Sequence, residues 1–202
     1  MSRVIPSVGR HELTKLVEFG NIDFPASLRI FGAPQAVGST GAVQARRTFV
    51  VETADYATGA DELAQAFTVD TPLLVAQISL ALQKFGGVTG ELWLDLLDDR
   101  TRKPGAVIAA SRRLPVGGLV ERGGYRWVVF DIAPETPGLV LSPGRYWAVL
   151  RSSGDGIFNW YFSLGSAYGD PDDTRARPRN ATDWNNVLNY RFNFRVTGLV
   201  KP

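Results

Sequence analysis

Residues 64–97 alternate apolar and polar side chains in three short runs separated by turn residues. In the middle run, apolar Ile78, Leu80 and Leu82 are interleaved with the smaller or polar side chains of Gln77, Ser79, Ala81 and Gln83. A period of two residues places successive side chains on opposite faces of a pleated strand, so this pattern is typical of a strand with one buried face. The pattern predicts β structure but indicates no chemistry.

Further strand-like runs follow at intervals of roughly ten residues, which is the spacing of β-sandwiches and barrels. We place eight strands, at residues 64–69, 74–84, 90–98, 107–113, 126–132, 144–151, 158–164 and 188–199. No helical period interrupts them, which disfavours a parallel βαβ architecture. The sequence therefore predicts an all-β chain with two packed sheets.

Turn residues and the last strand support this division. The glycine pairs at 86–87 and 117–118 supply backbone freedom, and the Pro-Gly steps within 103–105 and 142–144 predict type II turns. The last run predicts one buried face made of Leu188, Tyr190, Phe192, Phe194 and Val196. A slip of one residue in this strand would bury two arginines, so its register is well specified.

The pattern is looser before residue 59, and the chain is long enough for one domain with an extension. We expect residues 1–58 to form an N-terminal attachment or assembly segment and residues 59–202 to form the sandwich. Within the segment, the helical spacing of apolar residues at 13–17 predicts a short helix. Residues 47–52 read as a strand and residues 54–63 as a polar linker.

Composition excludes several function classes. The chain has no cysteine and one histidine, His11, so disulfides and a cysteine nucleophile are excluded and a catalytic triad would depend on that histidine. The net charge of +2 is too small to indicate nucleic-acid binding. We find no transmembrane stretch, and the first ten residues lack the apolar region of a secretory signal. We therefore expect no cofactor and no membrane insertion. If the protein acts outside a cell, we expect it to leave by another route, such as assembly into a particle that is released by lysis.

The order of five segments resembles a known group of proteins. These segments are FTVD, LLVAQISLALQKFGGVTGELWLDLLDD, KPGAVIAAS, WVVFDI and LSPGRYWAVL. Together they resemble the jelly-roll, carbohydrate-binding-module-like β-sandwiches of phage tail-fibre and other virion proteins and of some secreted bacterial proteins. The resemblance covers about residues 64–200 and implies a jelly roll of about eight antiparallel strands with an irregular N-terminal extension.

For function, the resemblance implies a non-enzymatic virion structural protein, such as a tail, fibre or head-decoration component. Its expected partners are other virion proteins and further copies of itself in a homo-oligomer, with a cell-surface glycan as a further ligand. The alternative is a secreted or cell-surface carbohydrate-binding module, with an extracellular location. An enzyme is the third interpretation. A fold resemblance alone assigns no function.

The best binding candidate in the sequence is the aromatic and amide-rich region 158–193. Phe158, Trp160 and Phe162 share one face of a strand and are expected in the core, while Tyr161 points the other way. Sugars are bound by flat aromatic faces together with planar polar groups. The candidate glycan residues are Tyr161, Tyr168, Asp170, Trp184, Asn185 and Asn186. The alternative is that Trp184 plugs the end of the sandwich.

Two groups of clustered carboxylates are candidates for catalysis or for metal binding. Glycoside hydrolysis needs paired carboxylates, which are present at Asp98 and Asp99 and within 170–173. However, Asp98 and Asp99 lie where solvated turn acids are expected. The 170–173 loop is rich in oxygen ligands for calcium yet lacks the EF-hand spacing. We assign no catalytic residue and no metal ligand. Trp93, between core-facing leucines, is a candidate protein-interface residue.

Overall fold

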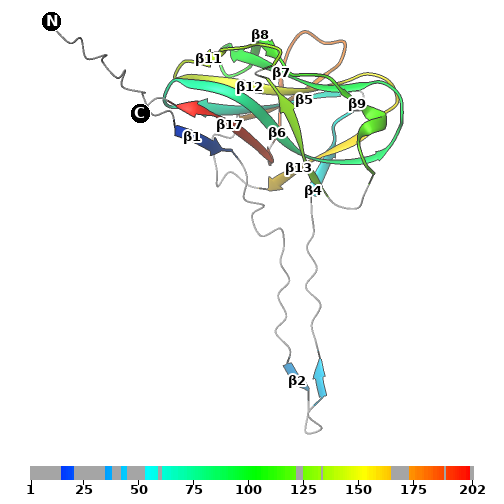
Figure 1. Ribbon diagram of the computed structural model, residues 1–202. Coiled ribbons are helices and arrows are strands. Elements are labelled where there is room, and N and C mark those ends of the chain that lie inside the picture. Colours follow the sequence, from blue (N-terminus) through cyan, green and yellow to red (C-terminus); the bar gives the residue numbers. More distant parts are fainter. Residues whose placement is uncertain are drawn as a thin grey trace, which may run out of the picture.

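The computed structural model describes residues 15–20, 35–37, 42–44, 53–58, 61–121, 125–132, 134–164, 173–188 and 190–200. Two antiparallel sheets pack face to face, and together they confirm the expected all-β sandwich (Figure 1). We name them after their central strands, the β6 sheet and the β12 sheet. Among the described residues, no helix is long and apolar enough to cross a membrane.

The β6 sheet has eight strands. Its main path runs through β1 (Lys15–Phe19), β17 (Phe194–Val200), β6 (Leu73–Gly86), β13 (Ile157–Leu164) and β16 (Tyr190–Phe192). Beside this path, β10 (Arg126–Asp131) and β11 (Val140–Leu141) pair with β6, and β4 (Thr53–Tyr56) pairs with β13. The long strand β6 therefore organises the whole layer.

The β12 sheet has seven strands. Its path runs through β15 (Asn186–Val187), β14 (Thr174–Pro178), β5 (Asp61–Val69), β12 (Gly144–Ser152), β7 (Glu91–Asp99) and β8 (Pro104–Ala110). The short β9 (Leu114–Pro115) pairs with β7 and leads into η1 (Val116–Gly118), a 3₁₀ helix. A separate two-stranded sheet joins β2 (Gln35–Val37) to β3 (Ala42–Gln44).

The main core lies between the two sheets and follows the alternation in the sequence. Ile78, Leu80 and Leu82 of β6 are fully buried, and so are Leu92, Leu94 and Leu96 of β7. Phe158 and Trp160 are also buried, while Phe162 packs against the core from a half-buried position. Trp160 stacks on Phe192 with ring centroids 4.2 Å apart. These burials confirm the predicted inward faces.

Two turns at one end of the sandwich approach each other through glycines. Gly90 and Gly154 both have positive φ, and a Cβ at either position would lie within 2.3 Å of a carbonyl oxygen of the facing turn. The carboxylate of Asp155 accepts hydrogen bonds from the backbone N–H groups of Val88 and Thr89, at 2.9 and 2.7 Å. Glycine is therefore needed here for close backbone approach as well as for conformation.

The predicted helix at 13–17 is wrong, because residues 15–19 form strand β1. This strand pairs antiparallel with β17, from Lys15 opposite Val200 to Phe19 opposite Val196 (Figure 1). The predicted polar linker at 54–63 is also wrong, since it contains most of β4 and the start of β5. Pairing of β1 with β17, of β4 with β13 and of β5 with β14 outweighs the weak local pattern of these two segments. The predicted strand at 47–52 lies outside the described residues.

The two predicted type II turns are wrong as well. Neither Gly105 nor Gly144 has the positive φ that such a turn requires, and both lie in strands. The β7–β8 connection instead turns at Thr101 and Arg102, with φ of 55° and 62°. Positive φ at both central residues is the geometry of a type I′ hairpin, which matches the right-handed twist of its flanking strands.

The predicted last strand is present, but Asn193 interrupts it between β16 and β17. Asn193 is fully buried, and its carbonyl oxygen accepts hydrogen bonds from the backbone N–H of Ala81 and the indole N–H of Trp160. Its own backbone N–H donates to the carbonyl of Tyr161. The backbone groups of Asn193 are therefore satisfied at the corner where the chain changes its partner from β13 to β6.

Candidate functional site

A second, smaller apolar cluster lies on the outer face of the β12 sheet. It comprises Ala64, Ala66, Leu97, Trp147, Val149 and Trp184. The strand residues Ala64 and Ala66 alternate with the inward-facing residues of β5, and their small side chains leave room for two indole rings. Trp184 is 3% exposed and so belongs to this cluster.

A network of ion pairs borders this cluster. The Nε atom of Arg177 donates to Oε2 of Glu62 at 2.7 Å, and its guanidinium lies 4.4 Å from the ring centroid of Trp184. Arg151 pairs with Asp95 at 2.8 Å and also with the other oxygen of Glu62. Burial acts to lower the pKa of Arg151, but its hydrogen bonds to Asp95 and Glu62 outweigh that effect and raise it. These charges are fixed in mutual contact.

Beside the network, the outer face of the sheet is hollowed into a groove of about 860 Å³. This groove is lined by the β7–β8 hairpin, by residues 182–184, and by Arg151 and Arg177. We name it the Trp184 groove. The ammonium of Lys103 donates a hydrogen bond of 2.6 Å to Oδ1 of Asn185. Segments that are far apart in sequence therefore meet at one polar surface.

Two of the acids that line the groove, Asp98 and Asp99, are engaged by hydrogen bonds from the hairpin and from β12. Oδ1 of Asp98 accepts a hydrogen bond from the backbone N–H of Ala106 at 2.5 Å. Asp99 accepts hydrogen bonds from the backbone N–H of Arg102 at 3.0 Å and from the indole N–H of Trp147 at 2.7 Å. These contacts agree with the interpretation of Asp98 and Asp99 as turn acids, because they shape the hairpin around its left-handed residues.

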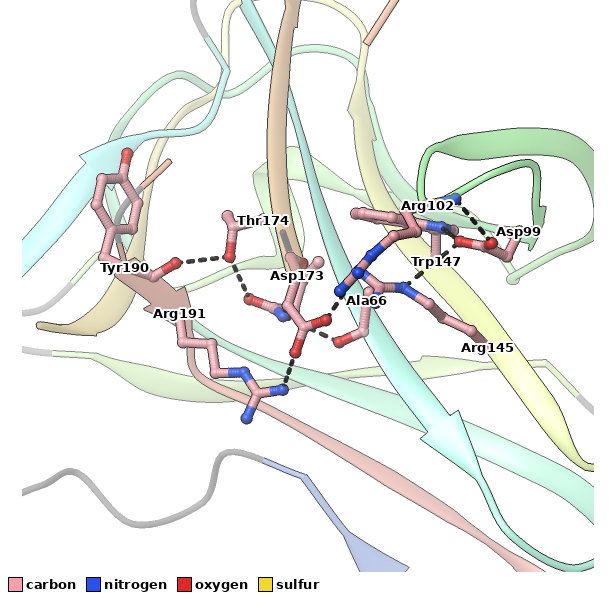
Figure 2. Close-up of polar contacts among 10 residues, drawn as sticks. Ala66, Asp99, Arg102, Arg145, Trp147, Asp173, Thr174, Tyr190 and Arg191 are labelled. Atoms are coloured by element: carbon pink, nitrogen blue, oxygen red, sulfur yellow. Dashed lines mark hydrogen bonds and ion pairs between the residues drawn. The ribbon is translucent and has the colours of Figure 1, made fainter. Parts of the chain in front are cut away.

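Asp173 lies between two arginines (Figure 2). Its carboxylate pairs with Nη2 of Arg145 at 2.8 Å and with Nη2 of Arg191. Because Arg145 lies on β12 and Arg191 on β16, these two ion pairs link the two sheets. It is 7% exposed. With both oxygens bound to guanidinium groups, Asp173 is poorly placed to serve as a calcium ligand.

Next to Asp173, Gln65 makes a second polar link between the sheets. Its side-chain amide donates to the carbonyls of Ala66 and Asp173, at 2.9 and 3.0 Å. Its Oε1 accepts from the backbone N–H of Phe192 and from the hydroxyl of Thr174, at 2.8 and 3.2 Å. Gln65 is fully buried, and these contacts satisfy its polar atoms.

The predicted glycan residues do not gather in one place. Tyr161 follows core-facing Trp160 on β13, so it faces away from the main core on the β6 sheet. It is 6% exposed, and its hydroxyl donates to Gln83 at 2.5 Å. Trp184 lies on the outer face of the other sheet. Asn185 and Asn186 are exposed beside it, at the start of β15. Tyr168, Asp170 and His11 lie outside the described residues.

Three features of the site were missed by sequence reasoning. Residues 174–178 lie outside every strand predicted from the sequence, but they form β14, which pairs with β5. Gln65 and the Arg151–Glu62 pair were not singled out either. Alternation in β5 and β12 was the available signal, since it places Glu62 and Arg151 on the outer face beside Ala64 and Val149. The predicted interface residue Trp93 is half-buried beneath the guanidinium of Arg113, 4.1 Å from its ring.

Comparison with protein-family models and with curated proteins finds no match for this chain. Among the described residues, no group of three or more histidine, cysteine, aspartate or glutamate side chains is arranged to hold a metal ion. The candidate site is a polar groove on the outer face of the β12 sheet, rimmed by the β7–β8 hairpin and by residues 182–184.

Proposed function

We propose that this chain is a non-enzymatic structural protein of a phage virion, in which a jelly-roll-like sandwich serves assembly and binds a host glycan. The order of strand segments in the sequence supports the virion assignment by resemblance. The Trp184 groove supports the binding role. Loops and edges that a rigid sheet holds in place commonly carry recognition.

The observation that carries the binding role is the kind of side chain at the groove. Lys103, Asp183 and Asn185 bring ammonium, carboxylate and amide groups to one surface, and such groups form hydrogen bonds with sugar hydroxyls. Oxygens of Asp98 and Asp99 are bound within the hairpin, which favours recognition over acid–base chemistry. Trp184 is packed under Arg177, so in this proposal it supports the groove rather than stacking on a sugar.

A glycan array tests the binding role. We expect the parent chain to bind a defined glycan set, and Lys103→Ala and Asp183→Ala to weaken that binding roughly tenfold or more. Asn180→Ala is the matched control, because Asn180 is exposed but does not line the groove. A parent chain that binds no glycan, or groove variants that bind as the parent does, would remove the glycan from the proposal.

The mass of the purified chain and micrographs of the assembled particle test the virion role. A trimer or hexamer that decorates a particle supports an appendage, since such proteins work as symmetric oligomers. A monomer that binds glycans and joins no particle supports the alternative, a secreted or cell-surface carbohydrate-binding module.

The proposed attachment role of residues 1–58 needs variants that retain β1 and β4, because both strands belong to the β6 sheet. One variant lacks residues 1–14, and in another a flexible Gly-Ser linker replaces residues 21–52. We expect at least one to keep the sandwich, measured by circular dichroism, while losing assembly. If both assemble like the parent, attachment resides elsewhere.

A further inference from the structure

A cleft of about 340 Å³ opens at one end of the sandwich, beside β9 and η1. Apolar side chains from four segments line it, including Leu82, Leu114, Leu119, Val128 and Phe158. Its volume lies at the small end of the range for small-molecule sites. It is separate from the Trp184 groove, with which it shares no lining residue.

One charged group lies in this apolar surrounding. Lys84, on the core-facing side of β6, lines the cleft and is 8% exposed. Its ammonium donates hydrogen bonds of 2.9 Å to the carbonyl oxygens of Val116 and Leu119. A lysine side chain is seldom buried to this degree unless its charge is matched.

The hydrogen bonds of Lys84 leave room for one more acceptor. An ammonium carries three N–H donors, and the two carbonyls use two of them. Among the described residues, the carboxylate oxygen that comes nearest to Nζ of Lys84 belongs to Glu121, at 4.0 Å, which is beyond hydrogen-bond distance. Residues in the described part of the chain supply no third acceptor. The side chain of Glu121 is 52% exposed, so it is free to turn into solvent.

We propose that this cleft, which we name the Lys84 cleft, binds a medium-chain alkyl carboxylate. The carboxylate accepts the third N–H of Lys84, and the alkyl chain lies against Leu114, Leu119 and Phe158. Arg126, which also lines the cleft, adds a second positive charge. A charge-assisted hydrogen bond in an apolar surrounding gives both affinity and orientation.

The simpler explanation is that Lys84 only fastens η1 to β6 through two carbonyls. That role needs no ligand and predicts no preference for an anionic head group. The proposal predicts such a preference and requires the apolar volume. The two explanations therefore differ in ligand binding, which can be measured without perturbing the fold.

Octanoate is the probe, with octanol as the neutral control of equal chain length, and isothermal titration calorimetry gives the affinity. We expect saturable binding of one octanoate per chain, with octanol roughly tenfold weaker or more. In an NMR titration, the indole N–H signal of Trp127, which lines the cleft, should shift with the same affinity. Absence of saturable binding, or equal binding of octanol, overturns the proposal.

Two variants locate the site. Leu119→Trp fills the cleft while keeping Lys84 and the Leu119 carbonyl, so we expect it to abolish octanoate binding. Lys84→Met should weaken binding roughly tenfold or more, provided that circular dichroism shows a folded chain. Lys103→Met makes the same change of charge in the Trp184 groove and should bind octanoate as the parent does. A folded Leu119→Trp variant with parental affinity would place the ligand elsewhere and overturn the assignment.

Discussion

The indole N–H of Trp147 donates a hydrogen bond of 2.7 Å to Oδ1 of Asp99, the last residue of β7. Trp147 is fully buried in the outer-face cluster, so this bond ties that cluster to the hairpin that rims the Trp184 groove. The same carboxylate accepts the backbone N–H of Arg102. One aspartate thus connects the outer-face cluster to the hairpin that rims the groove.

Replacing Asp99 tests this link. We expect Asp99→Ala to lower the free energy of unfolding by about 1–3 kcal/mol, because it leaves the indole N–H of Trp147 without its acceptor. Asp99→Asn keeps an acceptor oxygen and should lose less. Urea denaturation monitored by tryptophan fluorescence measures both. Equal losses in the two variants would show that charge, rather than the hydrogen bond, is what matters.

Trp184 offers a direct test of packing against ligand contact. We expect Trp184→Ala to cost about 3–5 kcal/mol of stability, because the ring is 3% exposed and packs against Ala66 and Trp147. Asn185→Ala, one residue further on and exposed, should change stability by no more than about 0.5 kcal/mol. Thermal denaturation compares them. A Trp184→Ala chain as stable as the parent would contradict the packing role.

The β7–β8 hairpin stores backbone strain at Thr101 and Arg102, which both have positive φ. Left-handed conformations cost an ordinary L-residue roughly 1–2 kcal/mol, and the cost is lower for asparagine and absent for glycine. We therefore expect the double variant Thr101→Asn, Arg102→Gly to gain about 1 kcal/mol or more and to melt at a higher temperature. Thr101→Val retains a β-branched side chain and should show no gain.

The pH dependence of stability should include a contribution from Asp155. Backbone hydrogen bonds, that from Thr89 foremost, lower the pKa of Asp155 below its ordinary value of 3.8. A lowered pKa in the folded state means that the contribution is fully present above pH 3.8 and is lost as the pH falls through the lower, folded-state value. In urea denaturation at pH values above and below 3.8, Asp155→Ala should therefore lose less stability on acidification than the parent. Identical acid sensitivity would contradict this assignment.

Much of the fold could be predicted from the sequence, because a period of two residues is a local property of a strand. Alternation in β6 and β7 correctly identified the buried faces, including Ile78 and Leu94. The same reasoning placed Trp160 in the core and Trp93 on the outer side of its strand. Where apolar and polar side chains alternate clearly, the hydrophobic effect alone selects the face that is buried.

Tertiary structure decided the rest. Nothing local marks residues 174–178 as a strand, because Arg175 and Arg177 are polar. These residues form β14 because they pair with β5, and Arg177 also makes an ion pair with Glu62. Likewise, whether Trp184 is a ligand platform or a packed ring depends on Ala66 and Trp147, which lie far away in the sequence. The alternation of a strand is encoded by residues that are neighbours along the chain. Open strand edges, buried charges and outer-face rings find their partners only when distant segments meet.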